Sequence, residues 1–340
     1  EIISNNICSL VPNKKRNALI CKIIFNLNGD IETYKFFEAL ICSFKRFTYN
    51  EIESNSHNDL QISGSINNLK KLTNVLLHKR LQRNALEINS TEPSVNIDNN
   101  GNVLGINMVK KLFAHQMIEE SMVAANICAA KFLRKNYQYG IYRVHEEPET
   151  LKIENLKKFF SLKGYLSQKN INTLDLINSF TKYANKNQDD KLLTVLILQS
   201  LKRARYSSKQ IGHFGLQLEQ YTHFTSPIRR YPDLLVHRMI KDVLNNSDSN
   251  FIHEDLEENL GELSSLEKRA EISSRQVNQQ LICYELKKFV GEEFESFVVG
   301  VAEFGLFCEI QNYYISGLLH VSDLKSDRYD NLPIQKYNRD

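Results

Sequence analysis

Clustered cysteines are missing from this 340-residue sequence, although it contains six cysteines in all. They stand far apart along the chain, and none forms a CxxC pair. A structural zinc site needs clustered ligands, and a disulfide framework needs dense cysteines in a short chain, so the pattern argues against both. We therefore expect buried, reduced thiols and an intracellular, cytoplasmic protein.

Long apolar runs are also missing. No segment approaches the roughly 18 consecutive apolar residues that a membrane-spanning helix requires. No basic segment followed by an apolar one opens the chain in the manner of a signal peptide. We expect no membrane association, and because the first residue is Glu1 and not Met, we expect the chain to begin inside a longer protein.

A strong charge of one sign is the third missing feature, since the net charge is only +3 and the pI is about 8.4. So small an excess does not by itself indicate a nucleic-acid ligand. The basic residues nevertheless gather in the middle of the chain, apart from an acidic run at 254–258. This segregation fits a polyanionic ligand, and it fits equally well a set of solvated helix faces. The basic residues concerned are Lys131, Arg134, Lys135, Lys202, Arg203, Arg205, Arg229 and Arg230.

Hydrophobic residues make up 42% of the sequence, enough for a sizeable core, and their spacing predicts an α+β chain. Apolar runs at 19–27 and 31–41 flank Asn28-Gly29-Asp30, a tight-turn signal that predicts a β-hairpin. Helical spacing predicts helices over 65–83, 107–135, 190–206 and 255–290. Short helices and polar loops are expected over 151–188.

The pattern changes after residue 290, where short apolar runs at 297–301, 305–310 and 313–321 are broken by glycines. This alternation predicts a small antiparallel barrel. We place a domain boundary near residue 288, so that 1–288 forms one domain and 289–340 a second. About 50 residues is short for a five-stranded barrel, so we expect the barrel to be incomplete.

The segment 212–234 carries the most chemistry, in the runs HFGL and YTHFTSPIRRYPDL. Pro227 suits the first turn of a helix and Ser226 its N-cap, which would place Arg229 and Arg230 in that turn. Free N–H groups and the positive end of the helix dipole favour a phosphate there, and arginine donates paired hydrogen bonds to phosphate oxygens. Asp233 could orient one guanidinium. The plainer alternative is a capped helix start with two surface arginines.

These two runs resemble the signature of the RNB-domain exoribonucleases, the family of ribonuclease II and ribonuclease R. Other stretches agree in order: 4–12 and 33–49 resemble the early RNB core, and 118–130 with 142–145 resemble its central helix and the following strand. Residues 291–324 resemble an OB-type RNA-binding domain of the ribosomal-protein kind. The resemblance implies an RNB core followed by an OB-type barrel. It also implies processive 3′-to-5′ hydrolysis of single-stranded RNA to nucleoside 5′-monophosphates, with a divalent metal, typically Mg²⁺.

Site residues carry over from the same resemblance. Arg229 matches the arginine that grips the phosphate at the cleavage site, and it is the catalytic candidate. Tyr49 matches a channel tyrosine near the RNA 3′ end, and Glu119 a glutamate that contacts the terminal ribose. The remaining RNA-binding candidates are His213, Tyr221, Thr225, Ser226, Arg230, Phe304, Phe307 and His320. The last three stand where an OB barrel presents aromatic rings for base stacking, with core packing as the alternative. For His213 and His223 we favour a structural or RNA-contact role over that of a general base.

The sequence departs from the family at the metal site. The family's closely spaced aspartates lie upstream of the 4–12 stretch, so they would fall before Glu1, and no aspartate of this chain matches them. We therefore expect no metal ligands in the chain, and exoribonuclease activity only in a longer protein. The alternative is a truncated RNA-binding protein without catalytic activity.

Overall fold

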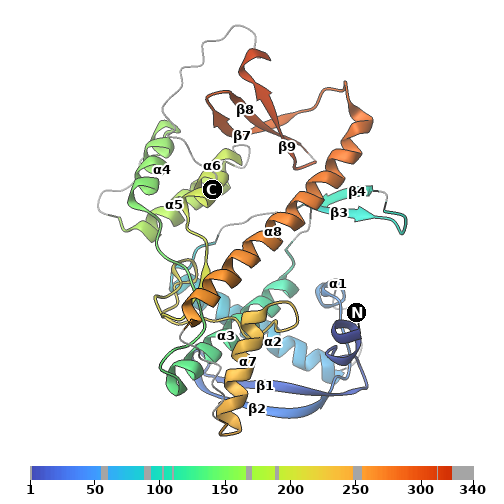
Figure 1. Ribbon diagram of the computed structural model, residues 1–340, viewed down its shortest axis with the longest axis vertical. Helices are drawn as coiled ribbons and strands as arrows, with labels where there is room; N and C mark the ends of the chain where they lie inside the picture. The colour runs from blue at the N-terminus through green and yellow to red at the C-terminus, as the bar shows by residue number, and fades with distance from the viewer. Residues whose placement is uncertain are drawn as a thin grey trace. The chain divides into compact units, whose positions relative to one another are not determined.

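The computed structural model describes residues 2–54, 60–87, 93–101, 103–108, 111–165, 171–187, 191–247, 255–311 and 313–323 (Figure 1). The chain forms two compact units that alternate along the sequence. The first comprises residues 1–86, 111–147 and 202–268, and the second 87–110, 148–201 and 269–340. The domain boundary that we place near 288 stays a prediction, and residues 324–340 of the second predicted domain lie outside the described residues.

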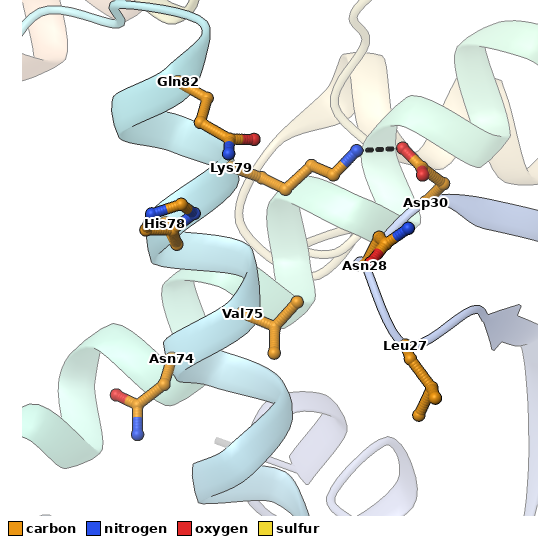
Figure 2. Close-up of a pocket in the computed structure, with 8 residues that line it drawn as sticks. All are labelled: Leu27, Asn28, Asp30, Asn74, Val75, His78, Lys79 and Gln82. Carbon is orange, nitrogen blue, oxygen red and sulfur yellow. Dashed lines mark hydrogen bonds and ion pairs between the residues drawn. The ribbon is translucent and has the colours of Figure 1, made fainter.

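In the first unit, the predicted hairpin is confirmed. Strand β1 (Lys15–Phe25) pairs antiparallel with β2 (Ile31–Cys42). Gly29 in the turn has a φ of +81°, and a Cβ there would lie 2.7 Å from Cγ1 of Val75 on helix α2 (Leu60–Gln82). Figure 2 shows Val75 directed toward the turn and the ion pair between Lys79 and Asp30. Both the backbone conformation and the packing against α2 therefore require glycine at this position.

Helix α3 (Phe113–Asn136) belongs to the core of this unit, which also contains helices α1 (Tyr49–Glu53) and α7 (Tyr231–Leu244). Its residues Cys128, Ala129 and Leu133 are fully buried, in a core that also contains Phe36 of β2. The helix begins later than predicted, because 107–108 belong to strand β4 of the second unit. Short apolar segments suit a strand as well as a helix, and here pairing with β3 decided the outcome.

Two short strands, the start of a long helix and a π-helical stretch also belong to the first unit. The helix predicted over 190–206 ends at Ser200, and Arg205–Ser207 instead forms strand β6, which pairs with β5 (Tyr142–Val144). The long helix α8 (Leu256–Leu286) was predicted correctly and begins in this unit. A π-helical stretch, Ile2–Ile7, precedes β1.

The second unit contains the hairpin of β3 (Pro93–Ile97) and β4 (Val103–Met108), and the helices α4 (Thr150–Leu162), α5 (Thr173–Lys186) and α6 (Lys191–Ser200). Beyond residue 290, the described residues form an antiparallel sheet of β7 (Ser296–Ala302), β8 (Gly305–Ile310) and β9 (Ser316–His320). Lys191 joins α6 to this sheet through Glu309, 2.6 Å away, and the Phe297 ring. The three predicted apolar runs thus form strands, although 313–315 precede β9 and Val321 follows it in a 3₁₀ turn.

Within the described ranges, no helix combines the length and apolar character needed to cross a bilayer. The mixture of helices and antiparallel strands confirms the α+β fold class.

Candidate nucleic-acid interface

The two signature runs are hydrogen-bonded to strand β5 and to His145, the residue that follows it. His145 donates its backbone N–H to the carbonyl of Gly212 (3.1 Å), and Phe214 donates its own to the carbonyl of His145 (2.8 Å). Farther along, the N–H of Arg143 donates to the carbonyl of Tyr221 at 2.9 Å. Backbone hydrogen bonds therefore hold the loop at both ends, independently of its side chains.

The HFGL turn is also tied to helix α2. Arg83, just beyond the end of α2, donates its Nε to the carbonyl of Leu216 at 2.9 Å. Gly215 donates its N–H to Nδ1 of His145 at 3.0 Å, and a Cβ on this glycine would lie 2.9 Å from that nitrogen. The other ring nitrogen of His145 contacts the carbonyl of Lys202 at 2.8 Å, so both ring nitrogens are engaged within the fold.

The helix after the second run starts later than predicted. Helix α7 begins at Tyr231, and Pro227 to Arg229 form a separate turn closed by the N–H of Arg230 on the carbonyl of Ser226 (3.1 Å). Ser226 is therefore not a helix N-cap, and Arg229 is not in a helical turn. The physical reason is Pro232, because a helix that began at 227 would carry this proline in its interior, where it lacks a donor and clashes with the preceding turn. The helix can begin only where Pro232 falls in its first turn.

The two arginines of the turn have different surroundings. Arg230 donates Nε and Nη2 to the two carboxylate oxygens of Asp233, at 2.9 and 2.8 Å, and Asp233 also accepts the N–H of Ser226 at 2.8 Å. The carboxylate is 0% exposed, so the predicted orienting role of Asp233 is confirmed for Arg230. Arg229 is exposed, and in the described part of the chain its side chain has no hydrogen bond or ion pair. Arg229 is thus the arginine that is available to a ligand.

The two histidines of the signature are neutral at neutral pH. Burial, together with the nearby positive charges of Arg230 and Arg143, lowers the pKa of His223 to about 2. Burial is also the main cause that lowers the pKa of His213 to about 3. The Nδ1 of His213 accepts the N–H of Leu216 at 3.1 Å, while Nδ1 of His223 contacts the Tyr206 hydroxyl at 2.9 Å. Such low pKa values suit neither ring to general-base catalysis, and the RNA contact of His213 stays a prediction.

Tyr221 lies in the interior and is only 8% exposed. Its hydroxyl accepts a hydrogen bond from Asn126 Nδ2 at 3.0 Å, and Oδ1 of the same asparagine accepts the N–H of Phe224 at 2.9 Å. Asn126 is a residue that our sequence reasoning missed, although a polar side chain on the buried face of an apolar helix was a usable signal. The hydroxyl of Thr225 is buried without a hydrogen-bond partner among the described residues. RNA contacts of Tyr221, Thr225 and Ser226 stay predictions.

A second group of candidates lies at the start of α3. The Tyr49 ring, 45% exposed, stacks on His115 with ring centroids 3.9 Å apart. One helical turn farther, the carboxylate of Glu119 pairs with Arg80 at 2.7 Å and Lys111 at 2.5 Å. Burial opposes ionisation of Glu119, but the hydrogen bonds from Lys111 and Arg80 outweigh it and lower its pKa. Glu119 is therefore an anion held by two cations, neither of which sequence reasoning had singled out for this role.

The three barrel candidates gather near one end of the β7–β8–β9 sheet. Phe304 is 50% exposed in the β7–β8 turn, and its ring contacts that of Phe307 edge to face at 6.2 Å. His320 closes β9 opposite Gly305, the residue after Phe304. The structure thus brings these residues together, while their contact with RNA is untested.

The metal site that the resemblance implies has no counterpart among the described residues. Among them, no group of three or more His, Cys, Asp or Glu side chains is arranged to hold a metal ion. The described part of the chain therefore offers no fitting donor set for magnesium. A separate hollow of about 630 Å³ lies between the β1–β2 turn and α2 (Figure 2), and none of the candidate residues lines it.

Comparison with known protein families gives a match, in which the model of the RNB domain covers residues 1–246. The chain belongs to the RNB domain family. The ribonuclease R of Vibrio parahaemolyticus serotype O3:K6 is 32% identical to it over 98% of the chain, and that of Buchnera aphidicola subsp. Schizaphis graminum is 34% identical over 97%. The RNB chain spans 42% and 47% of the lengths of these two relatives.

A solved structure supports the same conclusion. RNase R of Mycoplasma genitalium, in complex with ribose methylated single-stranded RNA, superposes with a TM-score of 0.86 at 26% sequence identity. The match covers 96% of the RNB chain and 53% of that protein. The family predicted from the signature runs is therefore confirmed.

Proposed function

We propose that this RNB chain is the RNA-gripping part of a hydrolytic 3′-to-5′ exoribonuclease that degrades single-stranded RNA processively to nucleoside 5′-monophosphates. The observation that carries the proposal is the pair of arginines in the family signature. Arg230 is locked onto the buried Asp233, whereas its neighbour Arg229 is exposed and unengaged within the described residues. The names of the curated relatives and the RNA in the Mycoplasma genitalium complex support it.

Each group of side chains has a separate role in this proposal. The Arg230–Asp233 pair holds the 226–230 turn, so that Arg229 can donate paired hydrogen bonds to a phosphate and stabilise charge that grows on it during cleavage. The anionic Glu119 can accept a hydrogen bond from a ribose 2′-OH, which DNA lacks. The neutral His213 and His223 take no part in proton transfer at neutral pH.

Two further parts of the proposal concern the whole protein. A divalent metal of the kind that the family uses, typically Mg²⁺, would activate water for phosphodiester hydrolysis when bound, and we propose this dependence for the full-length protein only. We also propose that the region from 289 onward is an OB-type RNA-binding domain with Phe304, Phe307 and His320 as its stacking residues. A cytoplasmic location stays a prediction from the scattered cysteines.

Two assays test the proposal. The first measures binding of a 12-nucleotide RNA and of the DNA of the same sequence to the chain in EDTA. We expect RNA to bind more tightly than DNA, and Glu119→Gln to reduce this preference. Absence of RNA binding would overturn the proposal.

The second assay measures release of mononucleotides from single-stranded RNA in Mg²⁺. We expect release by the full-length protein and none by the 340-residue chain. Release by the chain that survives repurification and is abolished by Arg229→Ala would show that our view of the missing ligands is wrong. A full-length protein that binds RNA and never shortens it would favour the alternative, a non-catalytic RNA-binding protein.

A further inference from the structure

The ring of Tyr49 rests on a histidine that the family resemblance does not assign to any role. The Tyr49 and His115 rings are parallel to within 25°, and their centroids are 3.9 Å apart. Although one face of the phenol ring is covered by the imidazole, Tyr49 is still 45% exposed. A tyrosine that is supported on one face and partly exposed is suited to receive a nucleobase.

Hydrogen bonds fix both partners of this stack. Nδ1 of His115 accepts the N–H of Leu112 at 3.1 Å, so in the neutral ring the proton lies on Nε2. Helix α1, which begins with Tyr49, is joined to α3 where Ala114 donates its N–H to Glu53 Oε2 at 3.2 Å. The start of α1 is itself fixed by a capping box of Thr48 and Glu51.

Glu119 follows His115 by four residues on the same helix, and side chains four residues apart lie on the same face. The stack therefore stands one helical turn from the carboxylate that Arg80 and Lys111 hold as an anion. An aromatic platform and a carboxylate acceptor are thus brought together, and they match two parts of a nucleotide, its base and its ribose hydroxyl. The cations that hold the carboxylate are themselves engaged, Lys111 by Glu119 and Arg80 by Glu119 and the buried Glu120.

We propose that His115 is a positioning residue, which holds the Tyr49 ring beside Glu119 so that one nucleotide near the RNA 3′ end meets both side chains. The identity of the ligand rests on the function proposed above, whereas the support of Tyr49 by His115 does not. His115→Phe keeps an aromatic ring under Tyr49, and His115→Ala removes it. His78→Ala, on the exposed side of α2, is the matched control.

The first experiment needs no RNA. Nitration of Tyr49 by tetranitromethane is followed by peptide mass spectrometry in the wild-type chain and the three variants. We expect faster nitration in His115→Ala, and wild-type rates in His115→Phe and His78→Ala. Equal rates in His115→Ala and the wild type would show that the histidine does not hold the ring.

The second experiment measures binding of RNA that carries 2-aminopurine at its 3′ end, in EDTA. We expect His115→Ala to bind about three- to tenfold more weakly, the range that one aromatic pair contributes. His115→Phe should recover most of the loss, and His115→Ala should add little in a Tyr49→Ala background. Additive effects, or no rescue by phenylalanine, would overturn the positioning role. A wild-type chain that binds no RNA would instead overturn the proposed function and the ligand assigned here, while the nitration result would still decide whether His115 supports Tyr49.

Discussion

Arg229 and Arg230 are adjacent in the sequence, yet their side chains have different surroundings in the fold. The guanidinium of Arg230 is bound at two points by a carboxylate with no solvent exposure. Arg229 projects from the turn that this pair stabilises and is exposed. Replacing Arg229 and breaking the Arg230–Asp233 pair should therefore separate activity from stability.

Replacing Arg229 should affect catalysis and leave folding intact. Arg229→Ala should change the free energy of unfolding by less than about 0.5 kcal/mol, because its side chain is exposed. In the full-length protein, single-turnover cleavage should slow by about two to three orders of magnitude, the usual cost of one preorganised donor. Arg229→Lys should restore only part of the rate, since it keeps the charge and loses the paired donors. If the whole defect lies in RNA affinity measured in EDTA, Arg229 grips the backbone and does not act in the cleavage step.

Replacing Asp233 should have the opposite effect on folding. Asp233→Ala leaves the half-buried Arg230 without its partner and Ser226 without its acceptor, so we expect a loss of about 3 kcal/mol or more. Urea unfolding of this variant beside Arg229→Ala measures the difference. Equal stability of the two variants would contradict the structural role of the Arg230–Asp233 pair.

At the scale of elements, the β1–β2 turn is shaped by the helix against which it packs. Gly29 combines a positive φ with a close approach to Val75, and Asp30 pairs with Lys79 one turn farther along α2. The turn signal in the sequence accounts for the hairpin, but the contact with α2 explains why no other residue fits at Gly29.

Gly29→Ala should therefore lower the free energy of unfolding by more than backbone strain alone. A left-handed conformation costs a residue with a Cβ about 1 kcal/mol, and the contact with Val75 should add to this. Gly101→Ala is the matched control, because Gly101 also has a positive φ but open space around its Cβ position. In a Val75→Ala background the cost of Gly29→Ala should fall to that of the control. An unchanged cost there would show that packing against α2 is not the cause.

At the scale of the whole molecule, buried neutral histidines couple stability to pH. The pKa values of His213 and His223, about 3 and about 2 in the folded chain, lie far below the ordinary value near 6.5. Below about pH 6.5 the unfolded chain therefore binds more protons than the folded chain, and stability falls as the pH falls.

Each of these histidines should cost about 1.4 kcal/mol of stability per pH unit once the pH is below about 6.5. We expect urea unfolding to give a constant free energy from about pH 8 to 7 and a steep decline between about 6 and 5, above the range in which most carboxylates titrate. His213→Gln removes one titrating group, so its decline should be shallower. A slope identical to that of the wild type would contradict the low pKa of His213.

Local chemistry in the sequence was sufficient to predict several features. The hairpin around Asn28-Gly29-Asp30, the helices near 65–83 and 255–290 and the strands after residue 290 follow from turn residues and apolar spacing, which act over a few neighbouring residues. The family follows from the two signature runs, and the start of α7 was also open to prediction, because Pro232 excludes a helix that begins at Pro227.

Other features depended on contacts between residues far apart in the chain, which no local pattern encodes. The pairing of β5 with β6 ended a helix that spacing alone would have continued through 206. Asn126 of α3 holds the loop that contains Tyr221 and Phe224, and His115 of the same helix supports Tyr49. Both contacts form only because packing places α3 against that loop and against α1. The sequence thus determined the family and several of the elements, while tertiary packing decided the remaining boundaries, which side chains are buried as supports, and which, like Arg229, are left exposed to a ligand.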